Sequence, residues 1–245
     1  MSATGRGAER QPMDFYRTPG WAVRAAIPVL GRPSSVLDLG CGDGAIGVEL
    51  RTAFGREPEI IGVELDPARA AIAGSKRAGD NAHWAYDAVE QHDVAAWAGE
   101  PWRGDRHDLV IANPPYTFAT LFADVAHLAV RPGGRIAFLL AIDWASSRER
   151  KEWHRAHPSD IHVLERRPSF GKFERPCRAC RGTGFVDPAR PDEAGGGARC
   201  SKCRGKGVLI SGTDSKQYAW FVWGLGLGGR WSILDCEVPK SRGAK

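Results

Sequence analysis

The sequence LDLGCGDGAIG, at residues 37–47, places four glycines within its last eight residues. It follows the apolar run SSVLDL and leads into AIGVELRTAF, whose apolar spacing is helical. This order predicts a strand, a tight turn and a helix. Glycines allow the turn and the close approach of a ligand, and the N-terminus of the following helix offers backbone N–H donors.

On both sides of this stretch, strand-like apolar runs alternate with helical segments. The runs are SSVLDLG, EIIGVELD, DLVIANPP, GRIAFLLAI, IHVLERR and YAWFVWGLG. Alternation of this kind predicts βαβ units, and therefore an α/β fold with a mostly parallel sheet covered by helices on both faces.

The composition changes between two of these runs. From residue 175 to residue 212 the periodicity is lost and Gly and Pro become frequent. We therefore expect a main domain, residues 1–174 and 213–245, that is interrupted by an insert, residues 175–212. The segment 175–207 holds eight basic and three acidic residues, which matches the formal net charge of +5 of the whole chain. A concentrated basic segment favours contact with a polyanion.

The insert also contains two CxxC pairs separated by nineteen residues: Cys177, Cys180, Cys200 and Cys203. This spacing predicts a structural Zn²⁺ held by four thiolates, with no open position for catalysis. The CxxCxGxG form resembles the zinc repeats of DnaJ-type chaperones. Disulfides or unligated thiols are the alternative. The insert is expected to contact the target, or else only to stabilise the fold with a solvated basic face.

The chain shows no sign of a membrane segment. Its N-terminus has no apolar stretch, and the longest apolar run, residues 136–142, is too short to cross a bilayer. We expect a soluble, cytoplasmic protein.

The glycine loop alone is compatible with two ligands. Gly42, Gly44 and Gly47 satisfy the GxGxxG spacing of dinucleotide-binding proteins, and Glu64 lies where a ribose-binding acid would fall. Asp38, however, precedes the glycines within the strand, and a carboxylate there suits a cationic ligand that carries an amino acid moiety better than a pyrophosphate.

With DLGCGDG, the acid of GVELD and the later NPPY, the sequence resembles the class I S-adenosylmethionine-dependent methyltransferases. The resemblance implies a Rossmann-like fold with a seven-stranded sheet, and here the insert would lie between the last two strands. It also implies a cofactor site formed by the glycine loop with Asp38, a ribose-binding acid and an adenine-binding acid. We assign these roles to Gly40, Gly42 and Gly44, to Glu64, and to Asp93, with Asp87 as the alternative to Asp93.

NPPY, at Asn113–Tyr116, resembles the motif of family members that methylate a planar amino nitrogen. The lone pair of such a nitrogen is delocalised. The side-chain oxygen of Asn113 and the carbonyl of Pro114 can each accept a proton of the NH₂ group and favour its pyramidal, nucleophilic form. Pro114 and Pro115 stiffen the turn, and Tyr116 is expected to stack on the substrate. Asn113 also borders the expected cofactor site.

Two further segments extend the resemblance. DFYRTPGW matches the FYxTP segment that closes over the cofactor in many adenine methyltransferases, through Phe15, Tyr16, Thr18 and Pro19; alternatively, Thr18 only caps a helix that begins at Pro19. RPSF and TDSKQYAWFVW are together similar to a phage and prophage family of DNA adenine-N6 methyltransferases. There Phe170 would stack on the flipped base, whereas ordinary core packing is its alternative role. Tyr218, Trp220, Phe221 and Trp223 are expected to form a buried strand.

These features predict a DNA adenine-N6 methyltransferase that uses S-adenosylmethionine and a structural Zn²⁺, with double-stranded DNA as its partner. Methylation of adenine in RNA and methylation of a protein glutamine at N5 are the alternatives. A nucleic-acid-binding protein that retains the fold for structure alone is a further alternative.

Overall fold

The computed structural model describes residues 16–78, 83–97, 107–168, 173–176, 179, 185–187, 190–194, 198–202, 208–211, 216–224, 226 and 228–236. The chain divides into two compact units, Met1–Pro168 with Ser215–Lys245, and Ser169–Asp214. Across the described ranges, no helix has the length and apolar character needed to span a membrane.

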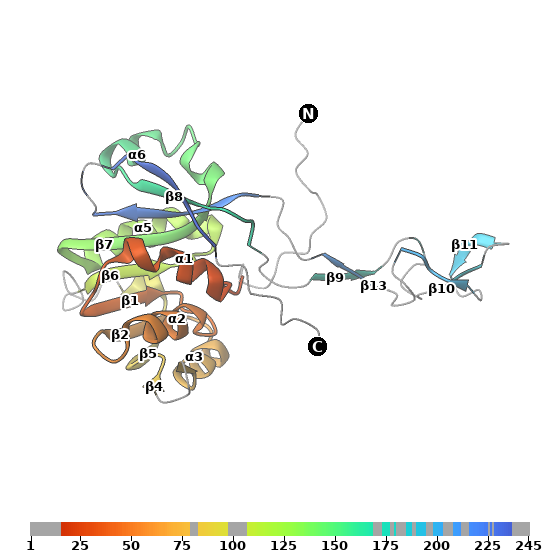
Figure 1. Cartoon of the computed structure of the whole chain (residues 1–245), viewed down its shortest axis with the longest axis horizontal. Helices are drawn as coiled ribbons and strands as arrows, with labels where there is room; N and C mark the ends of the chain where they lie inside the picture. The colour runs from red at the N-terminus through yellow and green to blue at the C-terminus, as the bar shows by residue number, and fades with distance from the viewer. Residues whose placement is uncertain are drawn as a thin grey trace. The chain divides into compact units, whose positions relative to one another are not determined.

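An eight-stranded sheet forms the centre of the large unit (Figure 1). Its strands, in spatial order, are β15 (Trp231–Leu234), β8 (Asp160–Leu164), β14 (Tyr218–Trp223), β7 (Val130–Ala141), β6 (His107–Ala112), β1 (Ser35–Leu39), β2 (Glu59–Glu64) and β5 (Ala88–Gln91). Strand β14 is antiparallel to both of its neighbours, and the remaining described pairs of this sheet are parallel. The predicted Rossmann-like α/β fold with a mostly parallel sheet is confirmed.

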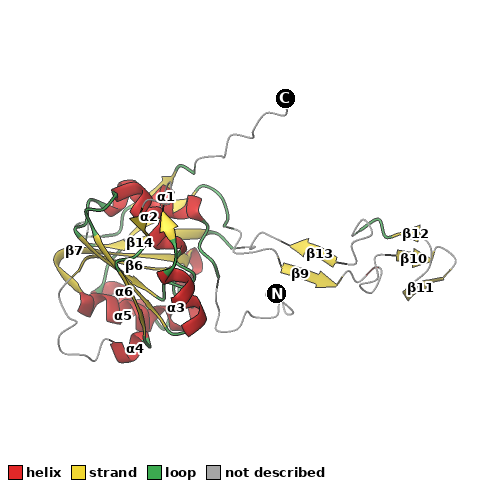
Figure 2. Cartoon of the chain, turned by 90° about the horizontal axis from the view of Figure 1, so that it is seen from below, coloured by secondary structure: helices red, strands yellow, loops and turns green. Residues whose placement is uncertain are grey.

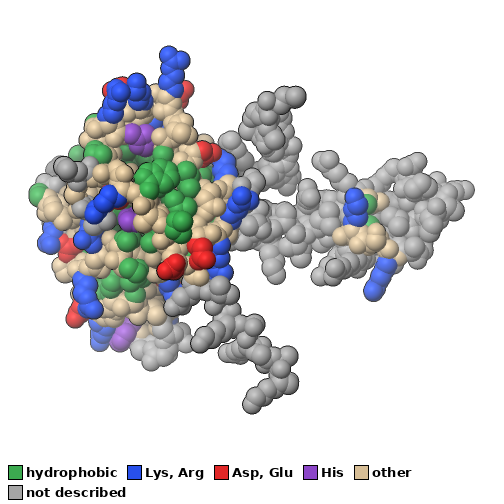
Figure 3. All heavy atoms as spheres, turned by 45° about the horizontal axis from the view of Figure 1, so that its top comes forward, with side chains coloured by type: hydrophobic (Ala, Val, Ile, Leu, Met, Phe, Trp, Pro, Cys, Tyr) green, Lys and Arg blue, Asp and Glu red, His purple; other side chains and the backbone are tan. Residues whose placement is uncertain are grey.

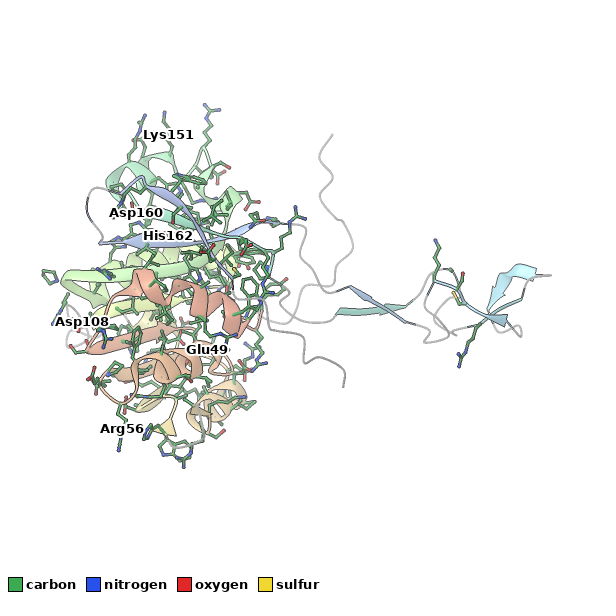
Figure 4. The ribbon with its side chains drawn as sticks, viewed as in Figure 1. Glu49, Arg56, Asp108, Lys151, Asp160 and His162 are labelled. Carbon is green, nitrogen blue, oxygen red and sulfur yellow. The ribbon has the colours of Figure 1, made fainter. Side chains whose placement is uncertain are left out.

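The prediction of seven strands is wrong, because β15 adds an eighth strand beside β8. Asp160, labelled at the start of β8 in Figure 4, accepts hydrogen bonds from the backbone N–H of Arg230 at 3.0 Å and from its guanidinium at 2.6 Å. These bonds hold the start of β15 against β8. The insert therefore lies between β8 and β14 and not between the last two strands.

Helices cover both faces of the sheet (Figure 2). α1 (Gly20–Leu30) and α2 (Ala45–Phe54) pack together on one face, and α4 (Val94–Trp97) and α5 (Ala119–Ala129) lie on the other. The large unit also contains α3 (Pro67–Gly74), α6 (Lys151–Ala156), the 3₁₀ helices η2 (Tyr116–Phe118) and η3 (Ile142–Ala145), and the short strands β3 (Arg77–Ala78) and β4 (His83–Trp84).

The core lies between these layers. All six residues of β14 are buried, which confirms the strand that was predicted from its aromatic residues. Ala219, Phe221 and Trp223 join a hydrophobic cluster with residues of β1, β6, β7 and α5. Burial of large apolar side chains is the main stabilising contribution to such a fold.

The register of the sheet brings three motifs to one edge. β1 lies between β2 and β6, with Leu39 paired to Val63 and Asp38 paired to Ile111. The residues that follow these parallel strands therefore lie at the same carboxyl edge, where the chain also reverses its direction of winding. Open α/β sheets bind ligands at such a position.

The small unit contains short antiparallel strands. β9 (Phe173–Pro176) pairs with β13 (Val208–Ser211), and β10 (Phe185–Asp187) pairs with both β11 (Arg190–Ala194) and β12 (Ala198–Arg199). Cys200 follows β12 and is buried. The sequence of this segment lacks the alternating pattern from which strands are predicted.

Candidate active site

A cavity of about 340 Å³ opens at the carboxyl edge of β1, β2 and β6. Its volume lies in the range of pockets that bind small molecules and cofactors. Its walls come from the glycine loop, the ends of β2 and β6, and the first turns of α2, α4 and α5. The lining residues are Tyr16, Thr18, Gly40, Cys41, Gly42, Asp43, Ala45, Ile46, Glu64, Leu65, Arg69, Asp93, Val94, Ala95, Asn113, Pro115, Phe118, Leu121 and Phe122.

The glycine loop follows β1 with three glycines at positive φ, which is a backbone region that other residues rarely adopt. The φ angles are 68° at Gly40, 58° at Gly42 and 83° at Gly44. Gly40 and Gly42 line the cavity, whereas Gly44 caps α2 and faces Ala73 and Tyr86. The loop therefore exposes backbone to the cavity through its first two glycines.

Glu64 ends β2 and is 5% exposed. Its carboxylate accepts the N–H of Gly42 on Oε2 and the N–H of Asp66 on Oε1, both at 2.9 Å. These bonds tie the glycine loop to β2. Each carboxylate oxygen keeps a further lone pair that can accept a hydrogen bond from a ligand hydroxyl.

The two candidates for the adenine-binding acid occupy different places. Asp93 lines the cavity and accepts the N–H of Ala95 at 2.9 Å, which caps the start of α4. Asp87 is bonded to the buried guanidinium of Arg51 at 2.6 Å and to the N–H of Ile60 at 2.8 Å. The carboxylate of Asp87 is therefore occupied by contacts within the protein, and of these two acids Asp93 is the one that a ligand in the cavity can reach.

Asn113 follows β6 and lines the cavity. Its amide nitrogen donates to the carbonyl oxygen of Tyr16 at 2.9 Å and to the hydroxyl of Thr18 at 3.0 Å. The carbonyl oxygen of Tyr16 can only accept, so the amide nitrogen of Asn113, and not Oδ1, must face residues 16–18. Among the described residues no donor meets Oδ1, which is thus available to accept a hydrogen bond from a substrate.

The alternative role of Thr18 as a helix cap is wrong. Helix α1 begins at Gly20, Pro19 is its N-cap residue, and no side chain caps it. Thr18 is buried and uses its hydroxyl on Asn113 instead. Tyr16 and Thr18 line the cavity, whereas Pro19 does not.

Tyr116 was expected to stack on a substrate, and its ring lies between two other tyrosine rings. Tyr16 stacks on it with the ring centroids 5.9 Å apart and 20° between the planes, and Tyr218 packs against it at 5.9 Å and 40°. Of the two prolines, Pro115 lines the cavity and Pro114 is buried behind it. Within the described set, the tyrosine that reaches the cavity is Tyr16.

Asp38 is fully buried in β1 and is not a lining residue. Its Oδ2 accepts a hydrogen bond from Tyr86 at 2.6 Å. Burial raises the pKa of Asp38 to about 7, with a smaller opposing effect from this hydrogen bond. Asp38 is therefore not in direct contact with the cavity.

Several predicted residues lie outside the described residues, namely Phe15, Phe170, Cys177, Cys180 and Cys203. Within the part of the chain that the structure describes, no group of three or more His, Cys, Asp or Glu residues could hold a metal ion. The structure thus gives no support to the predicted zinc site.

The sequence analysis missed the apolar walls of the cavity, which are formed by Ile46, Leu65, Val94, Phe118, Leu121 and Phe122. Leu65 follows Glu64 directly and Phe118 follows NPPY by two residues. The short distance in sequence between these two residues and the motifs was the signal from which they could have been predicted. Leu65 and Phe118 are about half exposed, at 51% and 56%, so they border the opening.

Charge is distributed differently at the cavity and over the surface. Asp43, Glu64 and Asp93 contribute carboxylates to the cavity, where Asp43 pairs with Arg17 at 2.6 Å. On the face of the large unit shown in Figure 3, the described acidic and basic side chains are interspersed. The cavity also contains the guanidinium of Arg69, which lies 3.8 Å from Oε1 of Glu64, so it combines both signs of charge with apolar walls.

The strand order, the glycine loop and the cavity together define the class I methyltransferase fold. Residues 25–135, a little under half of the chain, match the family model of the methyltransferase small domain. A predicted O-methyltransferase from Agrobacterium tumefaciens superposes with a TM-score of 0.53 and 16% identity, over 88% of this chain and 85% of that one. This likeness supports the fold.

Relatives with known names are similar over a shorter stretch. A tRNA1(Val) (adenine(37)-N6)-methyltransferase of Dickeya chrysanthemi is 36% identical over 104 residues, which is 40% of this chain and 38% of that protein. A protein of the same name from Yersinia pestis is 35% identical over 100 residues, again 38% of its length. The chain thus spans well under half of the length of these relatives.

Proposed function

We propose that this protein transfers a methyl group from S-adenosylmethionine to the exocyclic N6 of adenine in RNA. The observation that carries the proposal is the orientation of the Asn113 amide. Its nitrogen is held by Tyr16 and Thr18, so that its oxygen is the group left for a substrate beside the cavity.

The residues of the cavity fit the cofactor. Glu64 is placed to accept the ribose hydroxyls, because its carboxylate is already fixed by two backbone N–H groups. Asp93 and the apolar side chains of Leu65 and Val94 suit an adenine, which is planar with an exocyclic amine. Gly40 and Gly42 leave room for the amino acid end. When bound, the cofactor supplies an electrophilic methyl group on a sulfonium.

The reaction requires an amine whose lone pair is localised. We assign Oδ1 of Asn113 and the carbonyl oxygen of Pro114 as the two acceptors for the hydrogens of the N6 amine. The N6 lone pair forms the new bond to carbon as the bond from carbon to sulfur breaks, and the nitrogen then releases a proton to water. Positioning and fixed dipoles supply most of the acceleration in such a transfer.

RNA is preferred over the DNA that the sequence analysis expected. The named relatives modify adenine in a tRNA, and they are 36% and 35% identical to this chain over 104 and 100 residues. The resemblance to phage DNA methyltransferases finds no support in these comparisons. We retain the role of the basic insert, residues 175–212, as a contact for phosphates, which RNA supplies equally well.

The four cysteines of the insert remain our proposed ligands for a structural Zn²⁺. The proposal depends on their spacing, CxxC, nineteen residues, CxxC. A site of this kind would supply folding free energy to a Gly-rich segment with little apolar sequence.

A protein glutamine is the second substrate that the same site could take, since an amide nitrogen poses the same electronic problem. The two are separated by a transfer assay with methyl-labelled S-adenosylmethionine and, in parallel, unmodified tRNA transcripts, duplex DNA, single-stranded DNA and release factor. Label in RNA alone supports the proposal. Label in DNA or in protein alone assigns the site to that substrate, and a protein that binds RNA without cofactor binding or transfer would contradict an enzymatic role.

A further inference from the structure

The hydroxyl of Tyr86 connects two elements that flank the glycine loop. It donates to Oδ2 of Asp38 at 2.6 Å and accepts the backbone N–H of Gly47 at 3.0 Å. Asp38 lies in β1 before the loop, and Gly47 lies in the first turn of α2 after it. Because a backbone N–H can only donate, the proton of the hydroxyl must point to Asp38.

Three glycines make room for the Tyr86 ring. A Cβ added at Gly47 would lie 2.3 Å from the ring, one at Gly62 would lie 3.0 Å away, and one at Gly44 would lie 3.2 Å away. The Gly47 and Gly62 distances would force an atom to move. Gly47, the third glycine of the GxGxxG spacing, therefore leaves the space that the Tyr86 ring occupies.

The surroundings of Asp38 disfavour a negative charge on its carboxyl group. Burial raises its pKa to about 7, the Tyr86 hydrogen bond acts in the opposite direction, and Glu64 on β2 raises it further. Cys41, in the glycine loop, is kept as a neutral thiol by burial, which raises its pKa well above the ordinary value. Burial also raises the pKa of Tyr86, so its hydroxyl remains a donor. Oδ1 of Asp38 is buried without a described partner.

We propose that Tyr86 is a positioning residue for cofactor binding: its hydroxyl holds the Asp38 carboxylate and the first turn of α2 in one arrangement behind the glycine loop. The same hydrogen bond favours the ionised form of Asp38. An ionised Asp38 attracts the positively charged sulfonium and ammonium groups of S-adenosylmethionine. This inference rests on the proposed function, but its first test does not require the cofactor.

The first test follows the ionisation of Asp38 in the ligand-free protein, by carboxyl ¹³C NMR between about pH 5 and pH 9. We expect Tyr86→Phe, which keeps the ring and removes the hydroxyl, to move the Asp38 midpoint upward by about one pH unit or more, since a hydrogen bond to a charged group changes such an equilibrium about tenfold or more. The Asp38→Asn variant assigns the signal. An unchanged midpoint in a folded Tyr86→Phe protein would overturn the proposal.

The second test measures the dissociation constant for S-adenosylmethionine over the same range of pH by calorimetry. In the wild type, affinity should rise as pH increases through the Asp38 midpoint. In Tyr86→Phe this rise should occur at higher pH, so that binding is about fivefold weaker at pH 7 and nearly normal at pH 9. A structural loss would instead weaken binding equally at every pH, and that result would contradict the proposal.

The double variant Asp38→Asn with Tyr86→Phe is the last control. In the Asp38→Asn background, adding Tyr86→Phe should not alter the pH dependence of S-adenosylmethionine binding. If the wild type fails to bind S-adenosylmethionine while the NMR midpoint still moves, the link between Tyr86 and Asp38 stands and the proposed function fails. If the wild type binds and the midpoint does not move, the proposed function stands and the role of Tyr86 is refuted.

Discussion

Asn113 donates its side-chain N–H to the backbone carbonyl of Tyr16 over 2.9 Å. These residues are far apart in sequence, and the contact joins the end of β6 to the segment that precedes α1. It orients the amide on which the proposed chemistry depends.

We expect Asn113→Ala to reduce the rate of methyl transfer by roughly 100-fold or more, because it removes one acceptor that stabilises the reacting amine. Affinity for S-adenosylmethionine should change little. Single-turnover kinetics and calorimetry measure the two effects separately. A variant with normal turnover would exclude Asn113 from the reaction.

Thr18→Val should reduce the turnover rate by about two- to tenfold, since one of the two bonds that orient Asn113 is lost while the shape of the side chain is kept. Thr52→Val is the control, because Thr52 is exposed on α2, donates its hydroxyl to the carbonyl oxygen of Val48, and does not line the cavity. Equal rates for the two variants would show that the orientation of Asn113 does not depend on Thr18.

Substitutions at Asp93 and at Asp87 should affect different quantities, the first cofactor binding and the second the stability of the fold. Asp93→Asn, which keeps an oxygen that can cap α4, is expected to weaken S-adenosylmethionine binding with little change in unfolding. Asp87→Ala should lower the free energy of unfolding by about 1–2 kcal/mol, because Arg51 and the N–H of Ile60 each lose an acceptor. Urea denaturation and calorimetry measure both quantities. The reverse pattern would return the cofactor role to Asp87.

The attachment of β15 should depend on pH through Asp160. Hydrogen bonds from Arg230 hold the pKa of Asp160 below its ordinary value. A lowered pKa stabilises the fold above the pKa of the unfolded chain, and this contribution is lost as pH falls through the folded value. Asp160→Asn should therefore lower the melting temperature at pH 7, and the difference from the wild type should shrink below about pH 4. A constant difference would contradict this account.

The insert is tested by its metal content. Cys200→Ser should release the zinc that we propose, about one equivalent per chain, as measured by elemental analysis of the purified protein. Cys236→Ser is the control, because Cys236 is buried in the large unit and belongs to neither CxxC pair. Wild-type protein without zinc, or equal zinc in both variants, would refute the four-thiolate site.

The sequence was sufficient for features that depend on local patterns. The alternating apolar runs predicted the α/β sheet, and parallel strands necessarily bring the glycine loop, Glu64 and NPPY to one edge. Features that depend on long-range contacts were not predictable. Strand β15 is held by Asp160, seventy residues before Arg230, and the bond between Thr18 and Asn113 joins residues that are far apart in the sequence.

The choice between Asp93 and Asp87 illustrates the same limit. Both acids lie between the second and third strand-like regions, and only the buried position of Arg51 shows that Asp87 is already paired. Likewise, the partners of Tyr116 come from segments on either side of it in sequence, residues 16 and 218, so its two ring contacts could be found only in the fold.

The most direct test of the central claim is the chemical position of the transferred methyl group. Unmodified tRNA is incubated with the wild-type protein and S-adenosylmethionine, then digested to nucleosides and analysed by mass spectrometry against standards. The account predicts N6-methyladenosine, and its loss in Asn113→Ala. A methyl group on a ring nitrogen, a base carbon or a ribose oxygen would contradict the assignment of Asn113–Tyr116 as the site that activates an exocyclic amine.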